Sequence, residues 1–264
     1  MDAPRPPLAV TTIDKPDARL VALARRRAEA WGLPFWARSR GAGAAGARSL
    51  EAALGTVAEA LLVFGREGLT LWDRAGRLHF HPGMAHLRLL RLEAVEEDTF
   101  VRVAELQAGD RVLDATLGLG QDALVAARAV GPAGRVVGLE KSLALYAVVS
   151  EGLRDLEPGP RACAIEAVHA DARDYLQSLP DRAFDVVFFD PMFERPRKAQ
   201  PSFEVLRRYA EHAPLTPELL AEARRVARRW VVIKGSRHSE DLKKLGLTPE
   251  PGSRYAEVVW ARSR

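Results

Sequence analysis

A glycine-rich turn at residues 112–123 restricts the fold of this chain more than any other feature of its sequence. An apolar run that ends at Asp114 precedes the turn, and apolar residues at helical spacing follow Gly120. Glycines allow the backbone to approach a ligand closely, and open α/β sheets bind their ligands beyond the carboxyl ends of parallel strands. The turn therefore predicts an α/β fold with a nucleotide-type site after its first strand.

Apolar runs of strand length alternate with longer amphipathic segments after this turn. This order is typical of a doubly wound, mostly parallel sheet with helices on both faces, and we expect an antiparallel strand at its C-terminal end. The expected strands are 111–115, 135–140, 165–169, 185–190, 230–234 and 255–261, and the expected helices are 120–130, 142–153, 172–178, 217–228 and 239–244.

A different pattern precedes this region, which predicts a small N-terminal α/β module over residues 1–95 and a main domain over residues 96–264. The basic residues are concentrated in the module, because residues 1–95 contain 14 Lys and Arg against 9 Asp and Glu, whereas residues 96–264 contain 25 against 26. Such an asymmetry suits a nucleic-acid partner, whose phosphates bind Lys and Arg. An arginine-rich composition set by genomic base content or a hot habitat would explain the same excess. Within the module we expect a helix at 15–31 and strands near 59–64, 69–72 and 77–81, and a helix from 84 to about 106 leads into the main domain.

The composition excludes two other classes of protein. The single cysteine, Cys163, rules out a disulfide scaffold and favours a reducing, cytoplasmic setting. No apolar run approaches the roughly 18 residues of a membrane-spanning helix, so we expect no membrane association. His79 and His81 alternate to one face of an expected strand, but no cluster of Cys or carboxylates accompanies them, and we expect no metal site.

The glycine turn alone does not separate two classes of nucleotide-binding enzyme. It satisfies the dinucleotide fingerprint of nicotinamide dehydrogenases, and Glu140 at the end of the second strand suits ribose hydroxyls in either class. Asp114 ends the first strand, where enzymes that use S-adenosylmethionine (SAM) often keep an acidic residue near the amino-acid end of the cofactor. Asp171 follows the third strand, where it could accept a hydrogen bond from the adenine amino group, cap the helix at 172–178, or do both.

The segment that separates the two classes is Asp190-Pro191-Met192-Phe193, which ends a buried strand. It resembles the Asp/Asn-Pro-Pro-Tyr/Phe signature of amino-directed methyltransferases, and a dehydrogenase has no use for it. A conjugated exocyclic amine is a poor nucleophile, so Asp190 and a backbone carbonyl would orient its lone pair by accepting its protons, and Phe193 would stack on the base. The sulfonium of SAM is already positively charged, so this chemistry requires no metal.

A narrower resemblance covers most of residues 80–235. The segments 114–123, 139–141, 190–193 and 231–234 are similar to those of the small-subunit ribosomal RNA guanine-N2 methyltransferases and their uncharacterised bacterial relatives. Gly83-Met84-Ala85-His86-Leu87-Arg88 looks like the segment that this family has ahead of its cofactor turn. The resemblance implies a Rossmann-like SAM methyltransferase sheet, SAM as cofactor, and an exocyclic amine of a base in ribosomal RNA, such as guanine N2, as methyl acceptor. The partner would be ribosomal RNA or the small ribosomal subunit.

These arguments give three sets of expected site residues. Two other functions stay open at this point, namely a methyltransferase for DNA, protein or a small molecule, and an RNA- or ribosome-binding protein that retains SAM without turnover. The catalytic set is Asp190, Pro191 and Phe193; the cofactor set is Asp114, Thr116, Gly118, Gly120, Asp122, Glu140, Lys141, Asp171 and Ala172; the substrate set is His86, Arg88, Met192, Arg195, Arg197 and Lys198.

Overall fold

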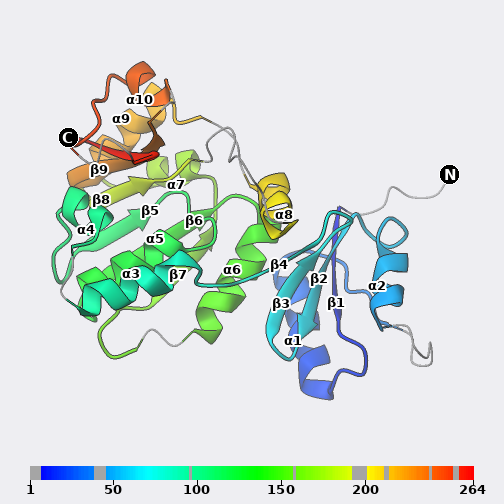
Figure 1. The fold of residues 1–264 in the computed structure, drawn as a ribbon. Coiled ribbons are helices and arrows are strands. Elements are labelled where there is room, and N and C mark those ends of the chain that lie inside the picture. The colour runs from blue at the N-terminus through cyan, green and yellow to red at the C-terminus, as the bar shows by residue number, and fades with distance from the viewer. Residues whose placement is uncertain are drawn as a thin grey trace. The chain divides into compact units, whose positions relative to one another are not determined.

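The computed structural model of the chain contains two compact units, each assembled from segments that are distant in the sequence (Figure 1). The first unit comprises Met1–Phe80, Leu143–Asp155 and Arg197–Tyr209, and the second comprises His81–Ser142, Leu156–Pro196 and Ala210–Arg264. The structure describes residues 7–38, 46–94, 97–156, 159–191, 201–210, 214–237, 240–251 and 256–264. Within these ranges, no helix combines the length and the apolar character needed to cross a bilayer.

The first unit is built on a four-stranded sheet in the order β1-β2-β3-β4. Strand β1 (Leu8–Thr12) pairs in parallel with β2 (Ala60–Gly65), and β3 (Gly68–Trp72) and β4 (Arg77–His79) continue the sheet in antiparallel pairs. Strand β1 was not expected from the sequence, because its last two residues are buried threonines that interrupt its apolar pattern. The helices of the first unit are α1 (Ala18–Ala30), α2 (Gly46–Ala53), α6 (Leu143–Asp155) and α8 (Pro201–Tyr209).

The single helix expected from residue 84 to about 106 is wrong, because two helices occupy this region. Helix α3 (Met84–Glu93) is followed by α4 (Thr99–Ala104). Asp98 begins the second helix, since its carboxylate accepts hydrogen bonds from the backbone amides of Phe100 and Val101 at 2.9 and 3.3 Å. An aspartate that caps a helix in this way satisfies backbone donors that a continuous helix would already use.

The second unit contains the predicted doubly wound sheet, with six strands in the order β10-β9-β8-β5-β6-β7 (Figure 1). All neighbouring pairs are parallel except β10 with β9, so the expected antiparallel C-terminal strand is confirmed. The strands are β5 (Arg111–Asp114), β6 (Arg135–Glu140), β7 (Ile165–His169), β8 (Phe184–Phe189), β9 (Ala227–Ser236) and β10 (Val258–Ser263); the remaining helices are α5 (Gln121–Val130), α7 (Ala172–Ser178), α9 (Pro217–Val226) and α10 (Asp241–Lys244).

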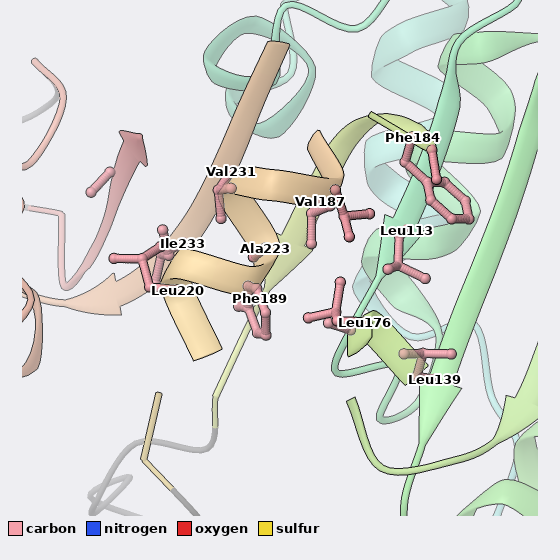
Figure 2. Close-up of a cluster of buried hydrophobic side chains, with 14 of the residues drawn as sticks. Leu113, Leu139, Leu176, Phe184, Val187, Phe189, Leu220, Ala223, Val231 and Ile233 are labelled. Carbon is pink, nitrogen blue, oxygen red and sulfur yellow. The ribbon is translucent and has the colours of Figure 1, made fainter. Parts of the chain in front are cut away.

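A continuous apolar core lies between this sheet and helices α7 and α9. Figure 2 shows Leu113 of β5, Val187 of β8 and Val231 of β9 directed toward Leu176 of α7 and Leu220 of α9. All five side chains are essentially inaccessible to solvent. Burying side chains of this size contributes about 1.5–3 kcal/mol each, which holds the strands in register and fixes the positions of their carboxyl ends.

Candidate active site

The glycine turn joins β5 to α5 in the predicted manner. Gly118 and Gly120 have positive φ values of 51° and 74°, a conformation that side-chain-bearing residues adopt only with strain. The turn is tied to the neighbouring strand, because the amide of Leu117 donates to the carbonyl of Leu139 at 2.8 Å. The amide of Gly118 donates to Oε2 of Glu140 at 3.2 Å. These bonds hold the turn at the carboxyl end of the sheet.

A pocket of about 250 Å³ lies beside this turn, at the carboxyl ends of β5, β6 and β8. Its walls combine apolar side chains with the carboxylates of Glu140, Asp171 and Asp190, which is the chemistry that a nucleoside bearing hydroxyls and a positive charge requires. The residues that line it are Ala115, Thr116, Gly118, Leu139, Glu140, Lys141, Ala170, Asp171, Ala172, Arg173, Phe189, Asp190, Pro191, Ala210, Pro214, Leu215 and Leu219.

The structure brings most of the expected cofactor residues to this pocket. Thr116, Gly118, Glu140, Lys141, Asp171 and Ala172 line it together with the expected catalytic residues Asp190 and Pro191. Three described residues of the cofactor set, Asp114, Gly120 and Asp122, lie behind the lining and not on it. Their expected part in cofactor binding stays a prediction.

Glu140 is held by the backbone on two sides. Its Oε1 accepts from the amide of Ser142 at 2.8 Å, and its Oε2 accepts from the amide of Gly118. The residue is only 7% exposed. A carboxylate has about four acceptor positions, which is enough for these two amides and for hydroxyl groups of a ligand. The side chain is therefore oriented before any ligand arrives.

Asp171 caps α7, which is one of the two roles that the sequence left open, and it also lines the pocket, while its expected hydrogen bond to the adenine amino group stays a prediction. Its Oδ1 accepts from the amide of Arg173 at 2.8 Å, and Oδ2 forms an ion pair with Nζ of Lys141 at 3.0 Å. Partial burial acts to raise the pKa of Asp171, but the bonds from Lys141 and from the Arg173 amide outweigh it and hold this pKa below its ordinary value. Asp171 is therefore ionised at neutral pH.

Asp190 follows the last residue of β8 and is fixed through both its backbone and its side chain. Its amide donates to Oγ1 of Thr116 at 2.6 Å, and its Oδ2 forms an ion pair with Nζ of Lys234 at 2.7 Å. Burial raises the pKa of Asp190, and the positive charge of Lys234 opposes that rise. Lys234 was not among the expected site residues, although it ends the apolar run of β9 at the same edge of the sheet.

Asp122 and Arg88 lie in one ion-pair network with Lys234. Oδ2 of Asp122 is 3.0 Å from Nζ of Lys234, and Oδ1 is 2.6 Å from Nη1 of Arg88. Arg88 also forms two hydrogen bonds with Asp98, at 2.7 and 2.9 Å. The guanidinium of Arg88 is thus engaged by two carboxylates, while His86 on the same helix is exposed. The expected contacts of both residues with RNA stay predictions.

Asp114 lies inside the unit, 2% exposed, where its Oδ1 accepts from the amide of Thr116 at 3.0 Å. Burial raises the pKa of Asp114 well above its ordinary value, and the nearby charges of Asp122 and Asp190 add to the rise. The side chain supports the turn through its hydrogen bond to Thr116, and its buried surroundings disfavour the charged form.

Five expected residues lie outside the described ranges. These are Met192, Phe193, Arg195, Arg197 and Lys198. The lining also contains residues that the sequence did not single out, among them Arg173, Pro214 and Leu215. Arg173 carries a positive charge at the pocket, and its position two residues after the capping Asp171 was the signal that could have identified it.

Comparisons with known proteins show which family this chain resembles. A family model described as "Putative SAM-dependent methyltransferase" matches residues 58–250. The uncharacterized protein YpiP of Bacillus subtilis is 33% identical over 244 residues, which cover 90% of this chain and 92% of that protein. The ribosomal RNA small subunit methyltransferase J of Thioalkalivibrio sulfidiphilus is 30% identical over 186 residues, which cover 66% of this chain and 71% of that protein.

Other relatives with the latter name match over about half of their own length. Among solved structures, a SAM-dependent methyltransferase from Aquifex aeolicus aligns with a TM-score of 0.40 at 16% identity, over 66% of this chain and 97% of that chain.

Proposed function

This chain belongs to the SAM-dependent methyltransferase family, and on that premise we propose that it methylates an exocyclic amine of a base in ribosomal RNA. The observation that carries the proposal is the position of Asp190 and Pro191. They end β8 and line the same pocket as the glycine turn, so an amine held by them would lie next to the cofactor. Relatives named ribosomal RNA small subunit methyltransferases support RNA as the acceptor.

The pocket suits SAM, the cofactor of the family. SAM, when bound, supplies a methyl group that its positively charged sulfonium makes electrophilic. We assign the ribose hydroxyls to Glu140, whose carboxylate is already oriented by two amides. We assign the adenine to the wall that Asp171 and Ala172 form with Leu139. Gly118 lines the pocket with a positive φ, which glycine adopts without strain, so the backbone of the turn can approach a ligand closely.

The residues at the end of β8 would prepare the acceptor. Oδ1 of Asp190 and the carbonyl oxygen of Pro191 would accept the two amine protons, which turns the nitrogen lone pair toward the methyl group. The oriented nitrogen would then take the methyl group that SAM supplies, and the sulfur of SAM would keep the electron pair of the former carbon–sulfur bond. The nitrogen then loses one proton to water. Phe193 keeps its proposed role of stacking on the base.

We assign RNA recognition to the N-terminal module and to the basic residues near the site. The module, residues 1–95, carries the excess of Lys and Arg. Contacts between these basic residues and phosphates would give the module an affinity for RNA that decreases as the salt concentration rises. The residues proposed to contact RNA are His86, Arg88, Met192, Arg195, Arg197 and Lys198. Guanine N2 is the proposed methylated atom, and a cytoplasmic location follows from the proposed substrate.

Incubation with methyl-labelled SAM tests the proposal. The acceptors are small ribosomal subunits and free ribosomal RNA from a strain that lacks the gene. We expect label in RNA with the wild-type enzyme and at least a 100-fold lower rate with Asp190→Ala, because loss of a positioning group misplaces the amine. Asp181→Ala is the matched control, since Asp181 is an exposed partner of Arg225 in the turn before β8, and it should retain full activity.

Three results would contradict the proposal. Absence of label in RNA, with SAM binding confirmed by calorimetry, would exclude ribosomal RNA as the acceptor. Label in protein or DNA would move the substrate to another class. Full activity of Asp190→Ala would exclude this residue from the chemistry.

A further inference from the structure

Asp190 is the last of five charged side chains that alternate in sign through the second unit. In order, these are Asp98, Arg88, Asp122, Lys234 and Asp190, and we call them the charged row. The closest contacts along the row are 2.7, 2.6, 3.0 and 2.7 Å. Its members come from five places in the chain: the cap of α4, α3, α5, β9 and the end of β8. The fold, not local sequence, brings them together.

The charged row is largely shielded from water. The side chains of Asp98 and Asp122 are each 8% exposed, and that of Lys234 is 22% exposed. Ion pairs in such surroundings often recover little more than the cost of removing the charges from water, and apolar side chains of similar volume would give equal or greater stability. Stability alone therefore does not explain why a row of charges leads to the active site, and perturbed ionisable groups of this kind concentrate at functional sites.

The row fixes the last carboxylate in one orientation. Lys234 engages Oδ2 of Asp190, and the amide of Asp190 is bound to Thr116. The side chain and the backbone of Asp190 are thus both held, which leaves Oδ1 as the oxygen for a ligand. A positioning group needs this kind of support, because an error of about 1 Å in an acceptor greatly reduces the rate.

The row also sets the charge of Asp190. Four ionisable groups act on this carboxylate: Lys234 from β9, Asp122 from α5, Arg88 from α3 and Asp114 from β5. Burial is the strongest influence and raises the pKa of Asp190. The positive charges of Lys234 and Arg88 oppose this rise, and the negative charge of Asp122 adds to it. The pKa of Asp114 is itself raised by burial and by the charges of Asp122 and Asp190. The row then contains three carboxylates and two cations, so one negative charge remains in excess beside a pocket that receives a cation.

We propose that Lys234 is a positioning residue for methyl transfer, which holds the Asp190 carboxylate ionised and directs its Oδ1 to the acceptor amine. This inference rests on the proposed function, because it assumes that the amine binds to Asp190. Asp122 competes with Asp190 for the same ammonium group and thereby limits how strongly Lys234 acts. The two neighbours of Asp190 should therefore have opposite effects on its titration.

Two substitutions separate this proposal from a purely structural role. Lys234→Met removes the positive charge but keeps the length of the side chain, so the pKa of Asp190 should rise by about 1 unit or more. Asp122→Asn removes a negative charge and leaves Lys234 to Asp190, so the same pKa should fall. Lys234→Arg retains the positive charge, so the pKa of Asp190 should stay near its wild-type value. A general loss of packing would not give shifts of opposite sign.

The measurement is a pH titration of the whole protein, labelled with ¹³C at the aspartate carboxyl carbons, followed by NMR without substrate. The Asp190 signal is identified by its absence in Asp190→Asn. Lys243→Met is the matched control, because Lys243 forms an exposed ion pair with Glu240 on α10 and its loss should leave Asp190 unchanged. Should Lys234→Met fail to fold, Asp122→Asn and Lys234→Arg still give a decisive result.

Methyl transfer gives a second readout. The acidic limb of the pH–rate profile should move to higher pH with Lys234→Met and to lower pH with Asp122→Asn. The rate that Lys234→Met loses should return as the pH is raised. Unchanged titration of Asp190 in both variants, or shifts in the same direction, would overturn the proposal. If ribosomal subunits accept no methyl group from the wild-type enzyme while the two NMR shifts are as expected, the proposed acceptor is wrong and the assignment of Lys234 stands.

Discussion

At the scale of single residues, the site depends on carboxylates whose neighbours set their charge. Glu140 and Asp171 are held by backbone amides, and Asp171 has its pKa lowered. Asp190 has its pKa raised by burial against the opposing charge of Lys234, and Asp114 has its pKa raised further. Neighbouring groups thus lower the pKa of Asp171, and burial raises the pKa of Asp190 and of Asp114, and such opposite shifts suit different tasks in one site.

Glu140→Gln should weaken SAM binding about 10-fold, without a large change in fold. The amide can still accept hydrogen bonds but has one acceptor oxygen fewer and no charge, and hydrogen bonds to charged groups contribute about 1.5–3 kcal/mol. Isothermal titration calorimetry measures the change. Glu166→Gln is the control, because Glu166 of β7 is exposed and its partner is Arg135 of β6. Equal affinities for the wild type and Glu140→Gln would remove Glu140 from the cofactor site.

Residue identities in the site could be predicted where they follow directly from strand ends. Glu140, Asp171 and Asp190 each lie at the carboxyl end of a predicted strand, and all three line the pocket. Lys234 was missed because its importance depends on a partner 44 residues away, and nothing in the local pattern of β9 shows that partner. Asp122 was expected to bind the cofactor, which stays a prediction, and only the fold shows that its oxygens are bound by Arg88 and Lys234.

At the scale of elements, Asp98 decides where α4 begins and also anchors Arg88. Asp98→Ala should therefore destabilise the protein by about 2–4 kcal/mol, because it removes a helix cap and one partner of Arg88, which is partly exposed and keeps its ion pair with Asp122. Urea unfolding measures the change. Asp17→Ala is the matched control, because Asp17 caps α1 through the amide of Leu20 without a comparable arginine, and it should cost only about 1 kcal/mol. Equal losses in the two variants would show that the pair with Arg88 adds nothing.

The same aspartate gives a pH dependence. Burial acts to raise the pKa of Asp98, but the bonds from Arg88 and from the amides of α4 outweigh it and lower this pKa. Its stabilising effect is therefore complete above the unfolded pKa of about 3.9 and is lost as the pH falls through the lower folded value. Between about pH 4 and pH 2, unfolding free energy should decrease more steeply for the wild type than for Asp98→Asn.

Elements with a strong period were predictable, and those defined by capping or by distant partners were not. Apart from α8, which was not expected, the strands and helices from β5 to β10 agree with the expected ones within a few residues, because buried strands and amphipathic helices have distinct apolar patterns. The division between α3 and α4 was missed, since Asp98 was not recognised as a cap. Strand β1 was missed because Thr11 and Thr12 are buried in the sheet despite their polarity.

At the scale of the whole molecule, the sequence predicts the doubly wound sheet but not the composition of the first unit. That unit includes α6 and α8, which come from the second half of the chain. The rhythm of strands and helices cannot show this, because α6 occupies an ordinary place between β6 and β7 in the sequence. Within the unit, Arg27 of α1 reaches Glu151 of α6 at 2.7 Å, a pair separated by 124 residues. The division at residue 95 stays a prediction.

The function of the whole molecule is most directly tested by nucleoside mass spectrometry of small-subunit ribosomal RNA. The RNA is taken from a strain without the gene, and from the same strain supplied with wild type or with Asp190→Ala. We predict that one base is methylated on its exocyclic amine in the strain supplied with the wild type. The same methylated base should be absent from the strain without the gene and from the strain supplied with Asp190→Ala. Identical nucleoside profiles in all three strains, or a methyl group gained on ribose, would contradict the assignment of Asp190 as the group that orients an RNA base amine.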